Sequence, residues 1–67
     1  MRYRDVITID PAKLGGRPCI RNLRITVHDV LGWLASGMSE DQILADHPDL
    51  TRHDIRTSLA YAAQREH

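Results

Sequence analysis

The sequence predicts a mainly α-helical domain, in which a bundle of three short helices follows a short N-terminal strand and a basic arm. Two observations lead to this prediction. A chain of 67 residues is long enough for only one small domain. Its apolar residues also change their spacing, from a short β-branched run before residue 10 to the helical period of about 3.6 residues after residue 26. We therefore expect a single domain, with the arm over residues 1–26 and a helical body over residues 27–67.

The arm contains one predicted strand. Residues 6–9, Val-Ile-Thr-Ile, are three β-branched aliphatic residues and a threonine, and the Asp-Pro pair that follows stops them. So short a strand needs a partner, and two remain open: residues 24–26 of the same chain, or the same strand of a second subunit. A loop is expected between these segments, because Gly15 and Gly16 free the backbone there.

Three helices are predicted in the body, over residues 27–36, 40–47 and 52–65. Gly37 ends the first helix, and Pro48 ends the second. Each helix follows a residue that can cap its first turn, and these residues are Thr26, Ser39 and Thr51.

The third helix is the longest, and its residues divide into two faces. The stripe expected to be buried comprises Ile55, Leu59, Ala62 and Ala63. The opposite face, mostly polar and with a small residue at its middle, holds His53, Arg56, Thr57, Ala60 and Gln64.

Short helices joined by tight turns, with the last one longest, are typical of homeodomain-like helix-turn-helix domains. The turn could lie at residues 36–38 or at residues 48–50. The first choice would place the acidic second helix against DNA phosphates, so the second choice is favoured, with the third helix as the reader. The alternative is that the third helix only packs the bundle and its polar face is ordinary solvated surface. The candidate DNA-binding residues are Arg52, His53, Arg56, Thr57 and Gln64.

The chain is electrically divided, although its formal net charge is zero. Residues 1–28 carry six basic and two acidic side chains, whereas residues 29–67 carry three basic and seven acidic ones. Arg17, Arg21 and Arg24 lie within eight positions, and arginine suits bidentate recognition of carboxylate or phosphate. They could hold DNA phosphates, enter an acidic metal-binding pocket of a partner protein, or remain solvated loop charges.

Several classes of function find no support in the sequence. Cys19 is the single cysteine, so no intrachain disulfide is available and burial as a small hydrophobic residue is expected. No catalytic arrangement or metal-ligand spacing is present, so we expect no enzyme, no cofactor and no metal. The small core favours a homodimer. No apolar run is long enough to span a membrane or to act as a signal peptide, so a cytoplasmic protein is expected.

Eight short segments follow one another at a specific spacing. They are Ile7-Thr8-Ile9-Asp10, Gly16-Arg17-Pro18-Cys19-Ile20-Arg21, Arg24-Ile25-Thr26-Val27, Val30-Leu31, Gly37-Met38-Ser39, Ile43-Leu44, Pro48-Asp49-Leu50-Thr51 and Asp54-Ile55. In this order they resemble the small bacterial family of domains of unknown function numbered 433. The resemblance covers nearly the whole chain.

The resemblance implies a helix-turn-helix-like trihelical fold, usually dimeric and often paired with a neighbouring PIN-like ribonuclease toxin. Members of that kind look like type II antitoxins of the VapB sort. Asn22 and Leu23 stand where the family usually has Gly and Thr, but asparagine tolerates the left-handed conformation, so the turn is expected to be kept. The residues that fall on the family's arm motif are Arg17, Pro18, Arg21, Arg24 and Ile25.

The expected function is therefore that of an antitoxin-like regulatory protein, which binds operator DNA as a homodimer and neutralises a PIN-like ribonuclease. In that role an arginine of the arm, Arg17, Arg21 or Arg24, enters the acidic metal site of the toxin. Two alternatives stay open. The chain could be a stand-alone DNA-binding repressor, or a dimerisation or adaptor domain that binds no DNA.

Overall fold

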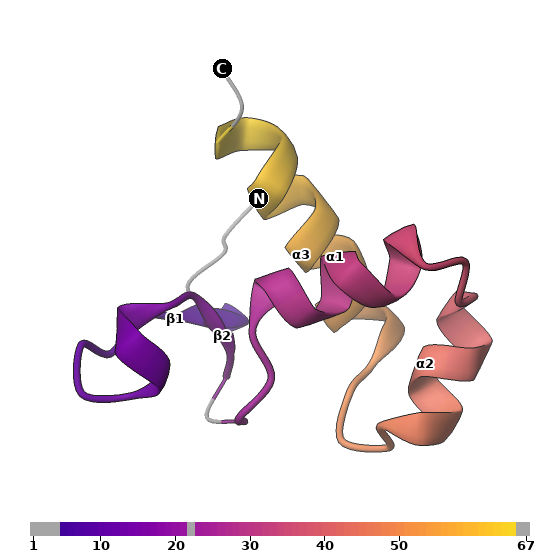
Figure 1. Cartoon of the computed structure of the whole chain (residues 1–67), viewed down its shortest axis with the longest axis horizontal. Helices are drawn as coiled ribbons and strands as arrows, with labels where there is room; N and C mark the ends of the chain where they lie inside the picture. Colours follow the sequence, from indigo (N-terminus) through magenta and orange to yellow (C-terminus); the bar gives the residue numbers. More distant parts are fainter. Residues whose placement is uncertain (1–4, 22, 66–67) are drawn as a thin grey trace.

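The structure is a computed structural model that describes residues 5–21 and 23–65. A two-stranded hairpin precedes three helices, and all predicted helix ends lie within one residue of the observed ones (Figure 1). The predicted class, a mainly α-helical three-helix domain behind a short strand, is confirmed. The elements are β1 (Ile7–Thr8), the 3-10 turn η2 (Leu14–Gly16), β2 (Cys19–Ile20), α1 (Val27–Ala35), α2 (Glu40–Asp46) and α3 (Arg52–Arg65).

The strand β1 pairs antiparallel with β2, so that Ile7 lies opposite Ile20 and Thr8 opposite Cys19. The expectation that residues 24–26 would pair with β1 is wrong. Those residues fold back on β2 instead, because the Ile20 N–H donates to the Ile25 carbonyl at 2.8 Å and Thr26 forms a bridge with Cys19. The strand β2 thus lies between β1 and the segment that enters α1.

Each helix begins with a pair of reciprocal hydrogen bonds between its cap and the third residue of its first turn. The cap hydroxyl accepts from the backbone N–H of the partner, and the partner's side chain accepts from the backbone N–H of the cap. Gly37 follows α1 with a φ of +100°, which supports its predicted role as the stop. The pairs are Thr26 with Asp29, Ser39 with Gln42, and Thr51 with Asp54.

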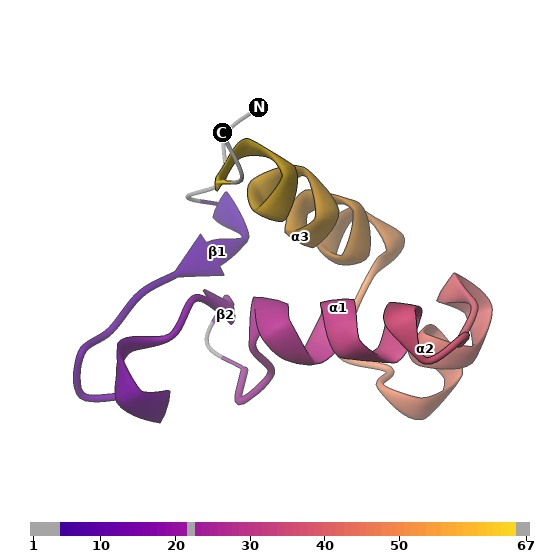
Figure 2. The ribbon, with the colours of Figure 1, turned by 45° about the horizontal axis from the view of Figure 1, so that its top comes forward.

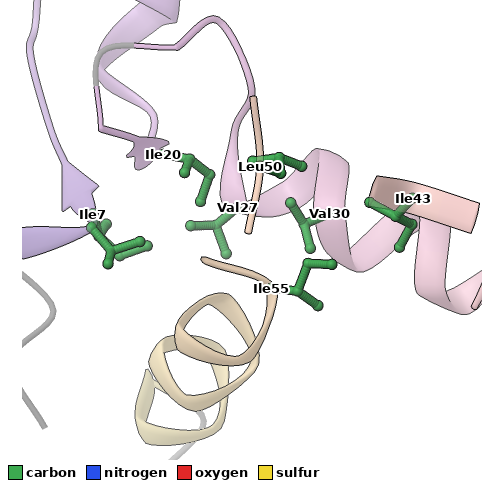
Figure 3. Close-up of a cluster of buried hydrophobic side chains, with 8 residues drawn as sticks. Ile7, Ile20, Val27, Val30, Ile43, Leu50 and Ile55 are labelled. Carbon is green, nitrogen blue, oxygen red and sulfur yellow. The ribbon is translucent and has the colours of Figure 1, made fainter. Parts of the chain in front are cut away.

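The hydrophobic core lies where the hairpin, α1, α2 and the start of α3 meet (Figure 3). Ile20 from β2, Val30 from α1, Ile43 from α2 and Ile55 from α3 are all fully buried, so β2 and each of the three helices contribute at least one such side chain. Burial of each stabilises the fold by roughly 1.5–3 kcal/mol. The complete cluster is Val6, Ile7, Ile20, Val27, Val30, Ile43, Leu50 and Ile55.

An aromatic stack closes the side of the bundle formed by α1 and α2. The indole of Trp33 and the imidazole of His47 have ring centroids 4.1 Å apart and planes only 14° from parallel. His47 is also the C-cap of α2, where its backbone N–H donates to the Ile43 carbonyl. The stack therefore fixes the end of α2 on α1 just before the chain turns toward α3.

The helix α3 is rotated relative to the sequence prediction. Its buried residues are Asp54, Ile55, Thr57 and Ser58. Leu59, expected inside, is 43% exposed, and Ala63 is exposed as well. Thr57, expected on the outer polar face, is fully buried, so both expectations are wrong. The rotation brings Asp54 inward to cap α3, and it fully buries the small Ser58, whose hydroxyl donates to the Asp54 carbonyl.

Thr57 provides a test of this packing, because its buried hydroxyl has no hydrogen-bond partner among the described residues. Thr57→Val keeps the shape and removes the unpaired group, so the free energy of unfolding should rise by about 1 kcal/mol and the melting temperature by roughly 4–8 °C. Urea and thermal denaturation measure both. Ser58→Ala is the control, since it removes a hydroxyl that does have a partner and should bring no gain. A less stable Thr57→Val variant would contradict the packing.

Candidate functional site

Arg21 ties the arm to the helices. Its guanidinium donates from Nη2 to the Asp54 carboxylate at 2.7 Å and to the Asp49 carbonyl at 2.6 Å. The Asp54 side chain is only 4% exposed, whereas that of Arg21 is 43% exposed. The same carboxylate oxygen accepts from the Thr51 N–H at 3.0 Å. One carboxylate therefore both caps α3 and anchors the arm, and we call this arrangement the Arg21 clamp.

The backbone of Arg21 is held as well as its side chain. Its φ of +47° lies in the left-handed region, which costs a non-glycine residue about 1–2 kcal/mol. Its N–H donates to the Val6 carbonyl at 2.5 Å, and its carbonyl accepts from the Thr8 hydroxyl at 2.5 Å. Arg21 is thus already bound within the chain, in contrast to the free arm position expected for it. The turn at Asn22, predicted to be left-handed, lies outside the described residues.

The two arginines predicted to read DNA from α3 face carboxylates of α2. Arg52 donates to Glu40 at 3.0 Å and also to Asp41, and the Nε of Arg56 lies 3.8 Å from Glu40. The hydrogen bonds to Asp41 and Glu40 raise the pKa of Arg52 above its ordinary value. Pairs this exposed are individually weak and are screened by salt, but they place negative charge beside the part of α3 that would approach a phosphate.

The five candidate DNA-binding residues therefore do not form one surface. Arg52, His53 and Arg56 lie together near the start of α3, where all three are exposed. Gln64 is exposed near the opposite end of the helix. Thr57 is fully buried and cannot reach a base edge in this fold.

Arg17 and Arg24 are placed differently from Arg21, the arginine that lies between them in the sequence. Both are exposed, and their side chains form no ion pair with any residue of the described ranges. Both line a single shallow depression of about 470 Å³ at the start of α1. Asp29 is the acidic residue of this depression, and its carboxylate accepts a hydrogen bond from the Thr26 N–H at 3.0 Å. The remaining lining residues are Leu14, Gly15 and Thr26.

A second surface beside this depression was missed by sequence reasoning. It is a groove between the first turn of α1 and the last turns of α3. Figure 2 shows that these two helical segments face each other. Its apolar signal was present in the sequence, because Ala62 belongs to the stripe predicted for α3, but that stripe was assigned to the core. We call it the α1–α3 groove, and its lining residues are Pro18, Val27, His28, Leu31, Tyr61, Ala62 and Arg65.

The described ranges hold no cluster of three or more histidine, cysteine or acidic side chains that could bind a metal ion. Cys19 is buried, as expected, and its thiol donates to the Arg17 carbonyl at 3.2 Å. None of the helices within residues 5–21 and 23–65 has the length and apolar character needed to cross a membrane. The site is therefore defined by arginines and an adjoining apolar groove.

Residues 7–62 match the family DUF433, described as a protein of unknown function. The chain belongs to the DUF433 family. The match covers the hairpin, α1, α2 and most of α3, so the resemblance drawn from the sequence is confirmed.

Two relatives are longer than this chain. The uncharacterized protein y4eO of Sinorhizobium fredii is 37% identical over 59 residues, which are 88% of this chain and 27% of y4eO. The crystal structure of a DUF433 member from Anabaena variabilis is 33% identical, with a TM-score of 0.86 over 91% of this chain and 60% of that one. The chain thus spans about a quarter of the first relative and less than two thirds of the second.

The Arg21 clamp can be tested by Arg21→Met, which keeps the apolar stem and leaves the Asp54 carboxylate without its cation. Loss of one partner of a fully buried pair costs roughly 3–5 kcal/mol, and partial exposure of Arg21 reduces the expected loss to about 2–3 kcal/mol of unfolding free energy. Urea denaturation measures this loss. Arg17→Met, on the same arm, should change stability by less than about 0.5 kcal/mol. Equal effects of the two substitutions would show that the clamp does not hold the fold.

Proposed function

We propose that this chain is an antitoxin-like regulatory module that binds an acidic protein partner of the PIN-like ribonuclease class through Arg17 and Arg24. One observation supports it above the others: these two guanidinium groups are exposed, share one depression and form no ion pair with a carboxylate of the described ranges. Arg21, Arg52 and Arg56 all form such an ion pair. Two arginines without an ion-pair partner among the described residues, in a chain where Arg21, Arg52 and Arg56 have one, fit a site that another molecule completes.

The chemistry of such a partner matches the pair. A nuclease that holds divalent metal ions does so with clustered carboxylates. Two guanidinium groups can satisfy those carboxylates through bidentate hydrogen bonds and replace the charge of the metal. In this proposal Arg17 and Arg24 inhibit the nuclease by occupying its metal site, and Arg21 holds the arm that presents them.

Operator binding is the second part of the proposed role, and the same chain can act as a plain repressor. The exposed start of α3 favours it, since Arg52, His53 and Arg56 lie there together. The net negative charge of α2, α3 and the turn between them opposes DNA binding, because residues 40–65 carry five acidic side chains and three basic ones. We therefore assign DNA a weaker, salt-sensitive contact than the acidic partner. A homodimer, which doubles both contacts, belongs to the same proposal.

Co-expression with the ribonuclease of the adjacent open reading frame tests the proposal. Because loss of desolvated charge pairs costs about 2–5 kcal/mol, Arg17→Ala with Arg24→Ala should weaken capture by about thirtyfold or more and restore ribonuclease activity. Copurification and an RNA cleavage assay give the two readouts. Full inhibition by the double variant would refute the arm mechanism.

Arg56→Ala is the matched control for DNA. It removes an exposed guanidinium group from α3, so it should leave capture of the ribonuclease unchanged. On operator DNA it should reduce the slope of log affinity against log salt by about one if Arg56 contacts a phosphate, or relax sequence preference if it contacts a base. A gel shift on the DNA upstream of the gene, repeated at several salt concentrations, separates these results.

A further inference from the structure

The α1–α3 groove is continuous with the depression that holds Arg17 and Arg24. A small intermediate hollow, lined by Arg17, Pro18, Thr26 and His28, shares Arg17 and Thr26 with that depression. It shares Pro18 and His28 with the groove. One surface therefore runs from the free arginines of the arm, past the start of α1, to the last turns of α3.

The middle of this surface is apolar and small. Leu31, Tyr61 and Ala62 line it, and Leu59 lies one turn before Ala62 on α3 with 43% of its surface exposed. The groove has a volume of about 280 Å³. Sites that enclose small-molecule ligands usually measure about 300–1,000 Å³, so this groove suits one or two apolar anchor side chains of a larger partner.

The rim of the surface is basic. Arg17 and Arg24 lie at one end, and Arg65 lies at the other with its guanidinium carbon 5.5 Å from the centre of the Tyr61 ring. This distance is typical of a cation–π interaction, which holds the Arg65 side chain beside the groove. The acidic lining residue among residues 5–21 and 23–65 is Asp29, which already caps α1. Such a rim attracts carboxylates.

The same charges argue against a second copy of this chain as the occupant. In a twofold interface each residue of the patch meets residues of an identical patch. Here that would bring Arg17, Arg24 and Arg65 of one copy toward the same cations of the other. Among the described lining residues these three cations face one carboxylate, Asp29, which already accepts the Thr26 N–H. A partner with the opposite charge avoids this repulsion.

We propose that the surface formed by the arm arginines and the α1–α3 groove receives an acidic amphipathic helix of a partner protein. The apolar side chains of that helix fill the space between Leu31 and Ala62, and its carboxylates pair with Arg17 and Arg24. The inference rests on the proposed function and deepens it, since it adds to the arginine contact an apolar anchor and so names the kind of segment the partner presents.

The experiment is an NMR titration of the ¹⁵N-labelled full chain. The probe is a synthetic helical peptide of about 18 residues, five turns, with leucines on one face and glutamates beside them. Amide signals of His28, Leu31 and Ala62 should move with this peptide. The same peptide with lysines in place of glutamates should bind at least about tenfold more weakly, a difference of ~1.4 kcal/mol.

Three substitutions locate the site. His28→Glu places a negative charge on the exposed rim, where the first turn of α1 tolerates glutamate, and should weaken binding about tenfold or more. Ala62→Glu should do the same from the groove itself. Gln64→Glu adds an equal charge to the same helix outside the groove and should change affinity by less than about twofold, or ~0.4 kcal/mol.

Several results would overturn the inference: unmoved groove signals, an equal response to the lysine peptide, the same signals moving on concentration of the chain alone, or their movement with a DNA duplex instead. Its failure is distinguishable from that of the proposed function. If His28→Glu leaves ribonuclease capture intact while Arg17→Ala with Arg24→Ala abolishes it, the groove has no part in binding and the arm mechanism stands. If the arginine substitutions have no effect, the proposed function itself fails.

Discussion

The contact between Arg21 and Asp54 is the constraint on which the rest of this small fold depends. Asp54 is nearly inaccessible to solvent, so its charge requires both the cap at Thr51 and the guanidinium group. To supply that group, Arg21 adopts a left-handed backbone, donates its N–H to the Val6 carbonyl and accepts at its carbonyl from the Thr8 hydroxyl. A single ionic contact therefore sets where the arm lies and which side of α3 turns inward.

The helices could be predicted from the sequence because their signals are local. Thr26, Ser39 and Thr51 act within one turn, and Gly37 acts on its own backbone, so all four appear in the structure as expected. The partner of β1 could not be predicted in the same way. It depends on the left-handed turn at Arg21, and an arginine gives no sequence signal for that conformation.

The site was predicted less well than the fold, and the reason is tertiary. A helical wheel places Thr57 opposite Ile55 and Leu59, but it cannot show that Asp54 must point inward to meet an arginine 33 positions earlier. That requirement buries Thr57 and exposes Leu59. Charge counting likewise identified the basic arm but could not separate Arg21 from Arg17 and Arg24, because only the folded chain shows which guanidinium group already has a carboxylate.

Under the proposed function, the position of Arg21 between Arg17 and Arg24 couples partner binding to the stability of the whole domain. A protein that binds Arg17 and Arg24 restrains the short segment between them, and with it Arg21, which anchors the arm to α3. Local opening of that segment, the step that exposes a chain to proteases, is then suppressed in the complex. If the proposed complex forms, the lifetime of this domain in the cell depends on whether the partner is bound.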